Sequence, residues 1–149
     1  MFPLPDPMRE ALAAAIEAAD DGEVPVGAVI TRGGKIIARA ANAPRRLNDP
    51  TAHAEILAIR AAALVLDRDR LDGCDLWVTL EPCAMCAGAI AHARIDRVYY
   101  GADDPKGGAI AHGPRFFTQP TCHHHPEIYP HIGERDSADL LRTFFAARR

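Results

Sequence analysis

The chain has 149 residues, of which 48% are apolar and 25% charged, a composition typical of a soluble globular protein with one domain, residues 1–149. The net charge of −3 does not favour a nucleic-acid-binding protein, although overall charge says little about a local patch. No apolar run reaches the length of a membrane span and no signal peptide begins the chain. We therefore expect a cytoplasmic protein with reduced thiols and no membrane partner.

The first part of the chain predicts a helix followed by a hairpin. Residues 7–21 carry apolar side chains at helical spacing, and residues 24–31 are typical of a strand. Gly33 and Gly34 provide a turn into a second strand at residues 35–41. After a further turn-like segment, an alanine-rich helix opens at His53.

The remaining elements alternate between strands and helices. In chain order we predict a buried strand at 76–80, a helix from Cys83 to about His92, a strand at 97–100, an irregular stretch at 114–126, a short strand at 127–132 and a last helix from Ser137. This order predicts an α/β fold, in which helices cover both faces of a mixed five-stranded sheet. The result is a three-layer α-β-α sandwich whose later strands are parallel.

Two short motifs bring together metal ligands and a carboxylate. His53-Ala54-Glu55 is followed, after one predicted strand, by Pro82-Cys83-Ala84-Met85-Cys86. Zinc binds imidazole nitrogen and thiolate sulfur, and a catalytic zinc site typically has three protein ligands and one water. His53, Cys83 and Cys86 can supply the three ligands. Glu55 lies two residues from His53, near enough to act on the water.

The two cysteines lie where their thiolates would be stabilised. Cys83 and Cys86 are three positions apart, so on a helix they share one face. Pro82 suits the first turn of that helix, because an N–H there has no intrahelical partner. The partial positive charge at a helix N-terminus lowers cysteine pKa values. We expect two helix starts to converge on one ion, with Glu81 capping or positioning the second helix.

Other interpretations of the cysteine pair remain open. A lone C-x-x-C can be a redox pair or half of a structural zinc site. A structural site would need a fourth protein ligand, which Cys74, Cys122 or one of the histidines 123–125 could provide. A disulfide between Cys83 and Cys86 is disfavoured, because nothing in the sequence indicates an oxidising compartment.

The combination of H-x-E and P-C-x-x-C is typical of zinc nucleobase deaminases. The chain resembles the bacterial tRNA-specific adenosine deaminases of the cytidine deaminase-like fold, nearly end to end. The most specific stretches are residues 23–29, 50–56 and 79–89, and the resemblance extends to residues 144–149. It implies a homodimer that converts adenosine to inosine at the wobble position of an arginine tRNA anticodon.

The resemblance also implies roles for individual residues. It assigns one zinc ion per chain to His53, Cys83 and Cys86, proton transfer to Glu55, and contact with the target base to Asn42. Contacts with the tRNA are implied for the following residues: Asp104, Lys106, Phe144, Phe145, Arg148 and Arg149. Alternatively, Asn42 could hold a turn before Pro44, and the basic tail could serve only solubility.

The sequence departs from the family pattern at residues 115–132. Here Cys122-His123-His124-His125-Pro126 replaces the commoner sequence around the fifth strand. We interpret the three histidines most simply as a solvated loop, with RNA contact or adventitious metal binding as the alternatives.

Three functions compete at this point. The first is deamination of adenosine in a tRNA anticodon loop, and the second is deamination of a free base or nucleoside such as guanine or cytosine by the same fold. The third is a zinc-stabilised binding module without turnover. Zinc chemistry does not separate the first two, because the same hydroxide can attack either ring. Asp104, Lys106 and the tail at 144–149 favour the tRNA-acting group.

Overall fold

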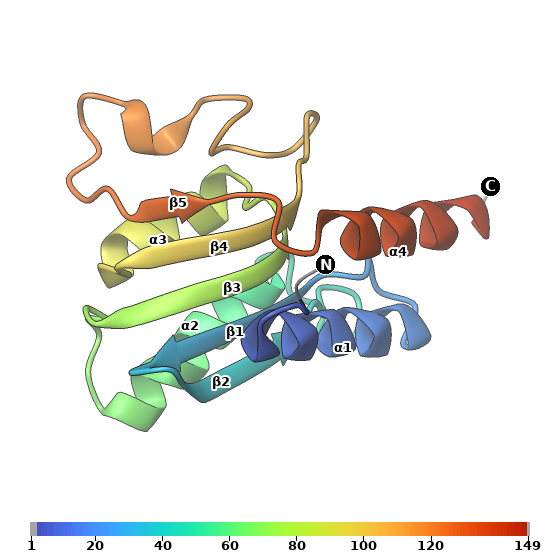
Figure 1. Ribbon diagram of the computed structural model, residues 1–149, viewed down its shortest axis with the longest axis horizontal. Helices are drawn as coiled ribbons and strands as arrows, with labels where there is room; N and C mark the ends of the chain where they lie inside the picture. The colour runs from blue at the N-terminus through green and yellow to red at the C-terminus, as the bar shows by residue number, and fades with distance from the viewer. Residues whose placement is uncertain (1–2, 149) are drawn as a thin grey trace.

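The computed structural model describes residues 3–148, which form four α-helices around a five-stranded sheet (Figure 1). The elements in chain order are α1 (Asp6–Asp20), β1 (Gly27–Arg32), β2 (Lys35–Ala41), α2 (Ala54–Leu66), β3 (Cys74–Leu80), α3 (Ala84–Ala93), β4 (Arg97–Ala102), a 3-10 turn (Phe116–Thr118), β5 (Glu127–Tyr129) and α4 (Glu134–Ala146). None of the helices within residues 3–148 has both the length and the apolarity to cross a membrane.

The sheet is mixed, with strand order β2-β1-β3-β4-β5. β1 pairs antiparallel with β2 and β3, whereas β3, β4 and β5 run parallel to one another. Helices α1 and α4 cover one face and α2 and α3 cover the other, so the predicted three-layer α-β-α sandwich is confirmed (Figure 1). The parallel strands are the later ones, as the order of elements predicted.

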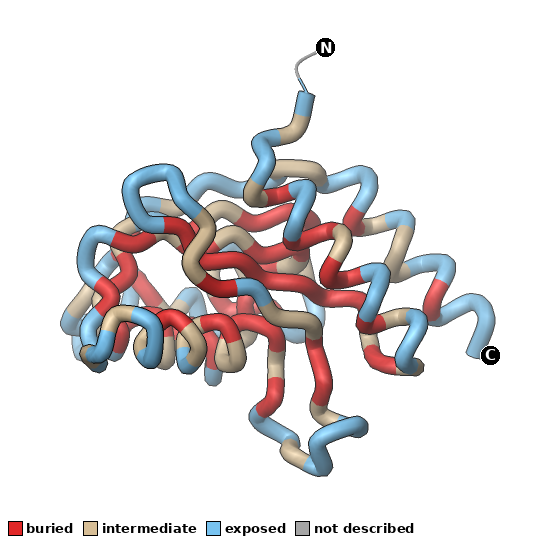
Figure 2. Tube along the Cα trace, turned by 90° about the horizontal axis from the view of Figure 1, so that it is seen from below, coloured by how far each residue is buried: buried red, intermediate tan, exposed pale blue. Residues whose placement is uncertain are grey.

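The core lies mainly between the sheet and the α2–α3 layer. Both helices add mostly small side chains to this core, and these side chains let α2 pack closely on the strands. The buried apolar residues that the two helices add to this cluster are Ala54, Ala58, Ala62, Ala87, Ile90, Ala91 and Ala93. A smaller cluster around Met8, Leu12 and Val29 holds α1 on the opposite face. Figure 2 shows the buried strands between exposed loops and helix surfaces.

Two predicted strands are shorter in the structure. β1 begins at Gly27 and not at Val24, because Pro25 cannot donate to a strand ladder and Val26 N–H turns back to the Val24 carbonyl, 2.8 Å away. Gly27 itself lies so close to α1 that a Cβ atom would stand 1.9 Å from a helix carbonyl. β5 ends at Tyr129, where Pro130 follows.

Two helix starts also differ from the prediction. α3 begins at Ala84, so Pro82 precedes the N-cap Cys83 and does not occupy the first turn. α4 begins at Glu134, three residues before Ser137, because Gly133 adopts a left-handed conformation (φ 74°) that starts the helix there.

Four chain segments meet at one edge of the sheet. β3 and β4 are parallel, so their carboxyl ends, at Leu80 and Ala102, lie side by side. β1 is antiparallel to β3, so the residues before Gly27 lie at the same edge. Gly27 pairs with Ala41 of β2, so the residues after Ala41 also lie at this edge. Ligand sites of α/β proteins commonly lie at such an edge.

Candidate active site

His53, Cys83 and Cys86 form one compact group at this edge. His53 is the N-cap of α2, Cys83 is the N-cap of α3, and Cys86 lies in the first turn of α3. The His53 Nδ1 atom is 3.6 Å from Cys83 Sγ and 3.5 Å from Cys86 Sγ. The predicted convergence of two helix starts is therefore observed.

The geometry of this group fits zinc. Tetrahedral bonds of about 2.0–2.1 Å to nitrogen and about 2.3 Å to sulfur place these two ligand atoms roughly 3.6 Å apart. All three ligand atoms lie within 4.8 Å of one another, and the group contains no fourth ligand from residues 3–148. Cys74 and Cys122 lie outside it, which leaves the structural four-ligand interpretation without support.

The three side chains also shift one another's protonation. The hydrogen bond from Cys86 and the contact with His53 together outweigh the opposing effect of burial and lower the pKa of the Cys83 thiol to about 4. The same hydrogen bond to Cys83 raises the pKa of the Cys86 thiol. The hydrogen bond between His53 and Cys83 raises the pKa of the His53 ring. Cys83 is thus held as the thiolate, the form that binds zinc.

Glu55 is a buried carboxyl group beside these ligands. Glu55 lies in the first turn of α2, and only 4% of the residue is exposed. It lines one cavity together with His53 and Cys83. Burial raises the pKa of this carboxyl above its ordinary value. A carboxyl with a raised pKa is suited to accept a proton and to donate it again.

The cavity at the ligand group has a volume of about 340 Å³, and we call it the metal pocket. It is lined by Val24, Val26, Asn42, Pro44, His53, Glu55, Leu80, Glu81, Cys83, Asp104 and Gly107. Asn42 lies just after β2, and its Nδ2 donates to the Val24 carbonyl at 3.2 Å, which fixes the orientation of the amide. The apolar wall of the pocket was not predicted from the sequence; Leu80 ends β3, and Val24 lies three residues before β1.

A second cavity adjoins the metal pocket and shares Val24, Leu80 and Asp104 with it. We call it the outer groove; its lining residues are Val24, Leu80, Asp103, Asp104, Lys106, Leu141, Phe145 and Arg148. Four of the predicted tRNA contacts therefore lie together. Phe144 does not join them, because it is buried beneath the Arg148 guanidinium, 3.5 Å from its ring centroid. Arg149 lies outside the described residues.

Glu81 plays a different part from the one predicted. Its carboxylate makes no hydrogen bond at the start of α3, where no side chain caps the helix. Instead it accepts hydrogen bonds from the loop after β4. Burial favours the neutral acid, but the N–H donors of this loop and the His112 ring outweigh it and lower the Glu81 pKa.

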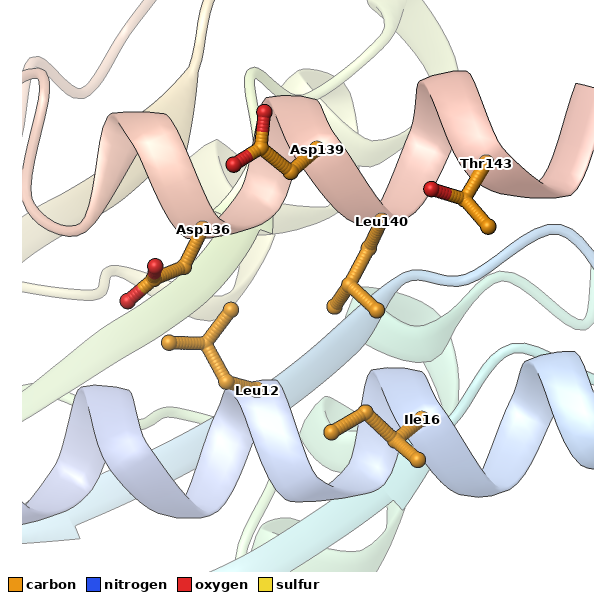
Figure 3. Close-up of a pocket in the computed structure, with 6 residues that line it drawn as sticks. All are labelled: Leu12, Ile16, Asp136, Asp139, Leu140 and Thr143. Carbon is orange, nitrogen blue, oxygen red and sulfur yellow. The ribbon is translucent and has the colours of Figure 1, made fainter.

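Other surface features lie apart from the metal pocket. Figure 3 shows a shallow cavity between α1 and α4, where Leu12 and Leu140 approach each other and no cysteine or histidine takes part. The predicted histidine loop is only partly solvated. His124 Nε2 bonds to the Ile95 carbonyl at 2.6 Å, and the His123 ring lies 5.4 Å from that of His92 on α3.

Comparison with known proteins identifies the family. The model of the cytidine and deoxycytidylate deaminase zinc-binding region matches residues 5–102, which include the complete ligand group. The tRNA-specific adenosine deaminase of Agrobacterium fabrum is 56% identical over 142 residues, covering 95% of this chain and 93% of that protein. The chain belongs to the tRNA-specific adenosine deaminase family.

Two solved structures of deaminases are similar to this chain. A structure from a study of A-to-I editing by tRNA:A34 deaminases at the wobble position is 56% identical, with a TM-score of 0.90 over 91% of this chain and 98% of that chain. A guanine deaminase from Bacillus subtilis is 46% identical, with a TM-score of 0.63 over 65% of this chain and 62% of that chain. The predicted cytidine deaminase-like fold is confirmed, and so is the prediction of a zinc-binding deaminase domain.

Proposed function

We propose that this deaminase converts adenosine to inosine at the wobble position of a tRNA anticodon loop by hydrolysis. The observation that carries the proposal is the 56% identity to a tRNA-specific adenosine deaminase over nearly the whole of both chains. An anticodon loop presents unpaired bases, so the enzyme avoids most of the cost of extracting a base from a duplex.

The ligand group is proposed to hold one zinc ion per chain through His53, Cys83 and Cys86. When bound, zinc acts as a Lewis acid that makes water nucleophilic at neutral pH. The supporting observations are the compact nitrogen–sulfur–sulfur donor set and the thiolate character of Cys83.

Glu55 is proposed to move the protons of the reaction. Water adds to C6 of adenine, and the Glu55 carboxylate accepts a proton from it and delivers that proton to N1. The Glu55 carboxylate then accepts the proton of the hydroxyl group at C6 and passes it to the amino group. The bond from C6 to the amino nitrogen breaks as C6=O forms, so that adenosine and water become inosine and ammonia. The buried position of Glu55 and its raised pKa support this role in proton transfer.

Asn42 is proposed to hydrogen-bond the edge of the target base. An amide side chain has both donors and an acceptor for a base edge. Its position in the metal pocket and the bond that holds its Nδ2 to Val24 support a fixed orientation.

The outer groove is proposed to hold the nucleotides that flank the target base. Lys106 and Arg148 offer cations for phosphates, and Phe145, which is 48% exposed, offers a ring for base stacking. Asp104 lines both cavities and stands where the target nucleotide and its neighbour would meet.

A homodimer is proposed as the assembled form. Large apolar side chains are exposed on the helices that cover one face of the sheet, including Leu64 (83%) and Val65 (62%) on α2 and Met85 (38%) on α3. Exposed apolar area of this kind is typical of protein interfaces. Sedimentation equilibrium should give twice the chain mass, and a single-chain mass at micromolar concentration would contradict the dimer.

The competing candidate is a free-base deaminase. The 46% identity to the guanine deaminase covers only 65% of this chain, so the comparisons favour the tRNA-acting family over this candidate. The test incubates the purified protein separately with an adenosine-34 tRNA, guanine, cytosine and adenosine. The proposal expects ammonia release and inosine only with the tRNA. Ammonia from a free base alone would favour the competing candidate.

A further inference from the structure

Glu81 is a buried carboxylate surrounded by hydrogen-bond donors. Its side chain is 0% exposed, and it lies between β3 and the ligand Cys83. The carboxylate accepts five hydrogen bonds from the loop after β4: from the N–H groups of Asp104 (3.0 Å), Ile110 (3.0 Å), Ala111 (2.9 Å) and His112 (3.2 Å), and from His112 Nδ1 (2.7 Å).

The loop from Asp103 to Gly113 is folded around this carboxylate. Gly108 passes so close that a Cβ atom would lie 2.5 Å from the Glu81 carboxyl carbon. The loop is tied to the metal segment a second time, because Ala109 N–H donates to the Pro82 carbonyl at 2.9 Å. No other side chain within residues 3–148 accepts so many bonds from one loop.

The same loop carries groups that face both cavities. Asp104 lines the metal pocket and the outer groove, Gly107 lines the metal pocket, and Lys106 lines the outer groove. The Asp104 Oδ1 atom accepts the N–H groups of Lys106 (3.2 Å) and Gly107 (2.9 Å), which makes a tight turn at the rim. The position of this turn depends on the bond from Asp104 N–H to Glu81.

We propose that Glu81 is a positioning residue that fixes the 104–112 loop and thereby controls RNA binding at the rim of the active site. This inference rests on the proposed function. Glu81 lines the metal pocket, but both of its carboxylate oxygens accept hydrogen bonds from the loop, which assigns it a positioning role. Its loss should therefore weaken substrate binding and leave the chemical step nearly intact.

The test is Glu81→Gln, which keeps the shape of the side chain but turns an NH₂ group toward backbone N–H donors. Steady-state kinetics with an adenosine-34 anticodon stem-loop should show KM raised about tenfold or more, with kcat per bound zinc within about threefold of wild type. The matched control is Glu127→Gln, an exposed glutamate on β5, which should leave both constants unchanged.

Two results would overturn the inference: a KM within about twofold of wild type, or a fall in kcat per zinc without a rise in KM. The fall in kcat without a rise in KM is expected if Glu81 has only a structural role, because fewer molecules of the variant would then be active. A wild-type protein that fails to edit the stem-loop would instead overturn the proposed function.

A milder variant keeps the inference testable if Glu81→Gln does not fold. His112→Ala removes one of the five donors from a side chain that is 32% exposed, so the fold should tolerate it. We expect KM to rise about threefold, because one charge-assisted bond is lost. The control is the exposed His125→Ala, and equal KM values for the two variants would refute the role of Glu81.

Discussion

The metal pocket and the outer groove adjoin each other but are built in different ways. The metal pocket takes its reactive groups from two short motifs at the starts of α2 and α3, and Glu55 and Cys86 are buried there. The outer groove combines Lys106, from the loop after β4, with Phe145 and Arg148 at the end of α4, and these side chains are exposed.

This difference separates the two tasks of the enzyme. Buried groups at helix starts are held rigidly and have perturbed pKa values, which suits proton transfer. Exposed cations and rings on separate elements suit contact with a charged, flexible substrate. Changes in the metal pocket should therefore reduce turnover, and changes in the outer groove should reduce binding.

The largest effect is expected for Cys83→Ala, which removes one of the three proposed zinc ligands. Zinc content should fall nearly to zero, and turnover should fall to background. Metal analysis by mass spectrometry checks this, with Cys122→Ala as the control, because Cys122 is half-buried but lies outside the ligand group. Full retention of zinc by Cys83→Ala would show that the ligand set is wrong.

Glu55→Ala should keep its zinc and its affinity for tRNA while kcat falls by about 10²–10⁴-fold or more, because proton transfer is lost. Single-turnover rates and metal analysis on the same preparation check both parts. Glu134→Ala, an exposed glutamate at the start of α4, is the control. Activity within a few-fold of wild type would remove Glu55 from the mechanism.

Asn42→Ala should lower kcat/KM by about 10–100-fold, because a buried hydrogen bond to the base is lost. The melting temperature tells whether Asn42 acts on the base or only on the turn before Pro44. Unchanged kinetics with a lower melting temperature would assign it to the turn.

Deleting residues 146–149 should have the smallest effect, and it should change only the binding of tRNA. Removal of two arginines should lower the log–log slope of tRNA affinity against salt by about 1–2, with zinc content unchanged. The control is Arg142→Gln, which removes an arginine of α4 that pairs with Asp139. A truncated protein with wild-type affinity and salt dependence would exclude the tail from RNA binding.

The sequence predicted the metal pocket well because its chemistry is local. His53, Glu55, Cys83 and Cys86 lie within two motifs whose spacing and helix starts determine their geometry. The parallel strands followed from the alternation of elements. The ends of β1 and β5 were misplaced by three residues, because prolines and one close glycine contact determine them.

The outer groove was harder to predict because its geometry depends on packing between distant segments. Phe144 and Phe145 are neighbours in sequence, yet one is buried and the other is exposed, since adjacent helix residues point in different directions. The donors to Glu81 lie 23 to 31 residues after it, in an irregular loop without a periodic pattern. Its role in the loop therefore emerged only from the structure.

The most direct test of the proposed function is the nucleoside at position 34 of a tRNA treated with the pure protein. Mass spectrometry of the digested tRNA should show adenosine-34 converted to inosine by the wild type and left unchanged by Glu55→Ala. An unmodified tRNA, together with ammonia released from guanine or cytosine by the same preparation, would contradict the account.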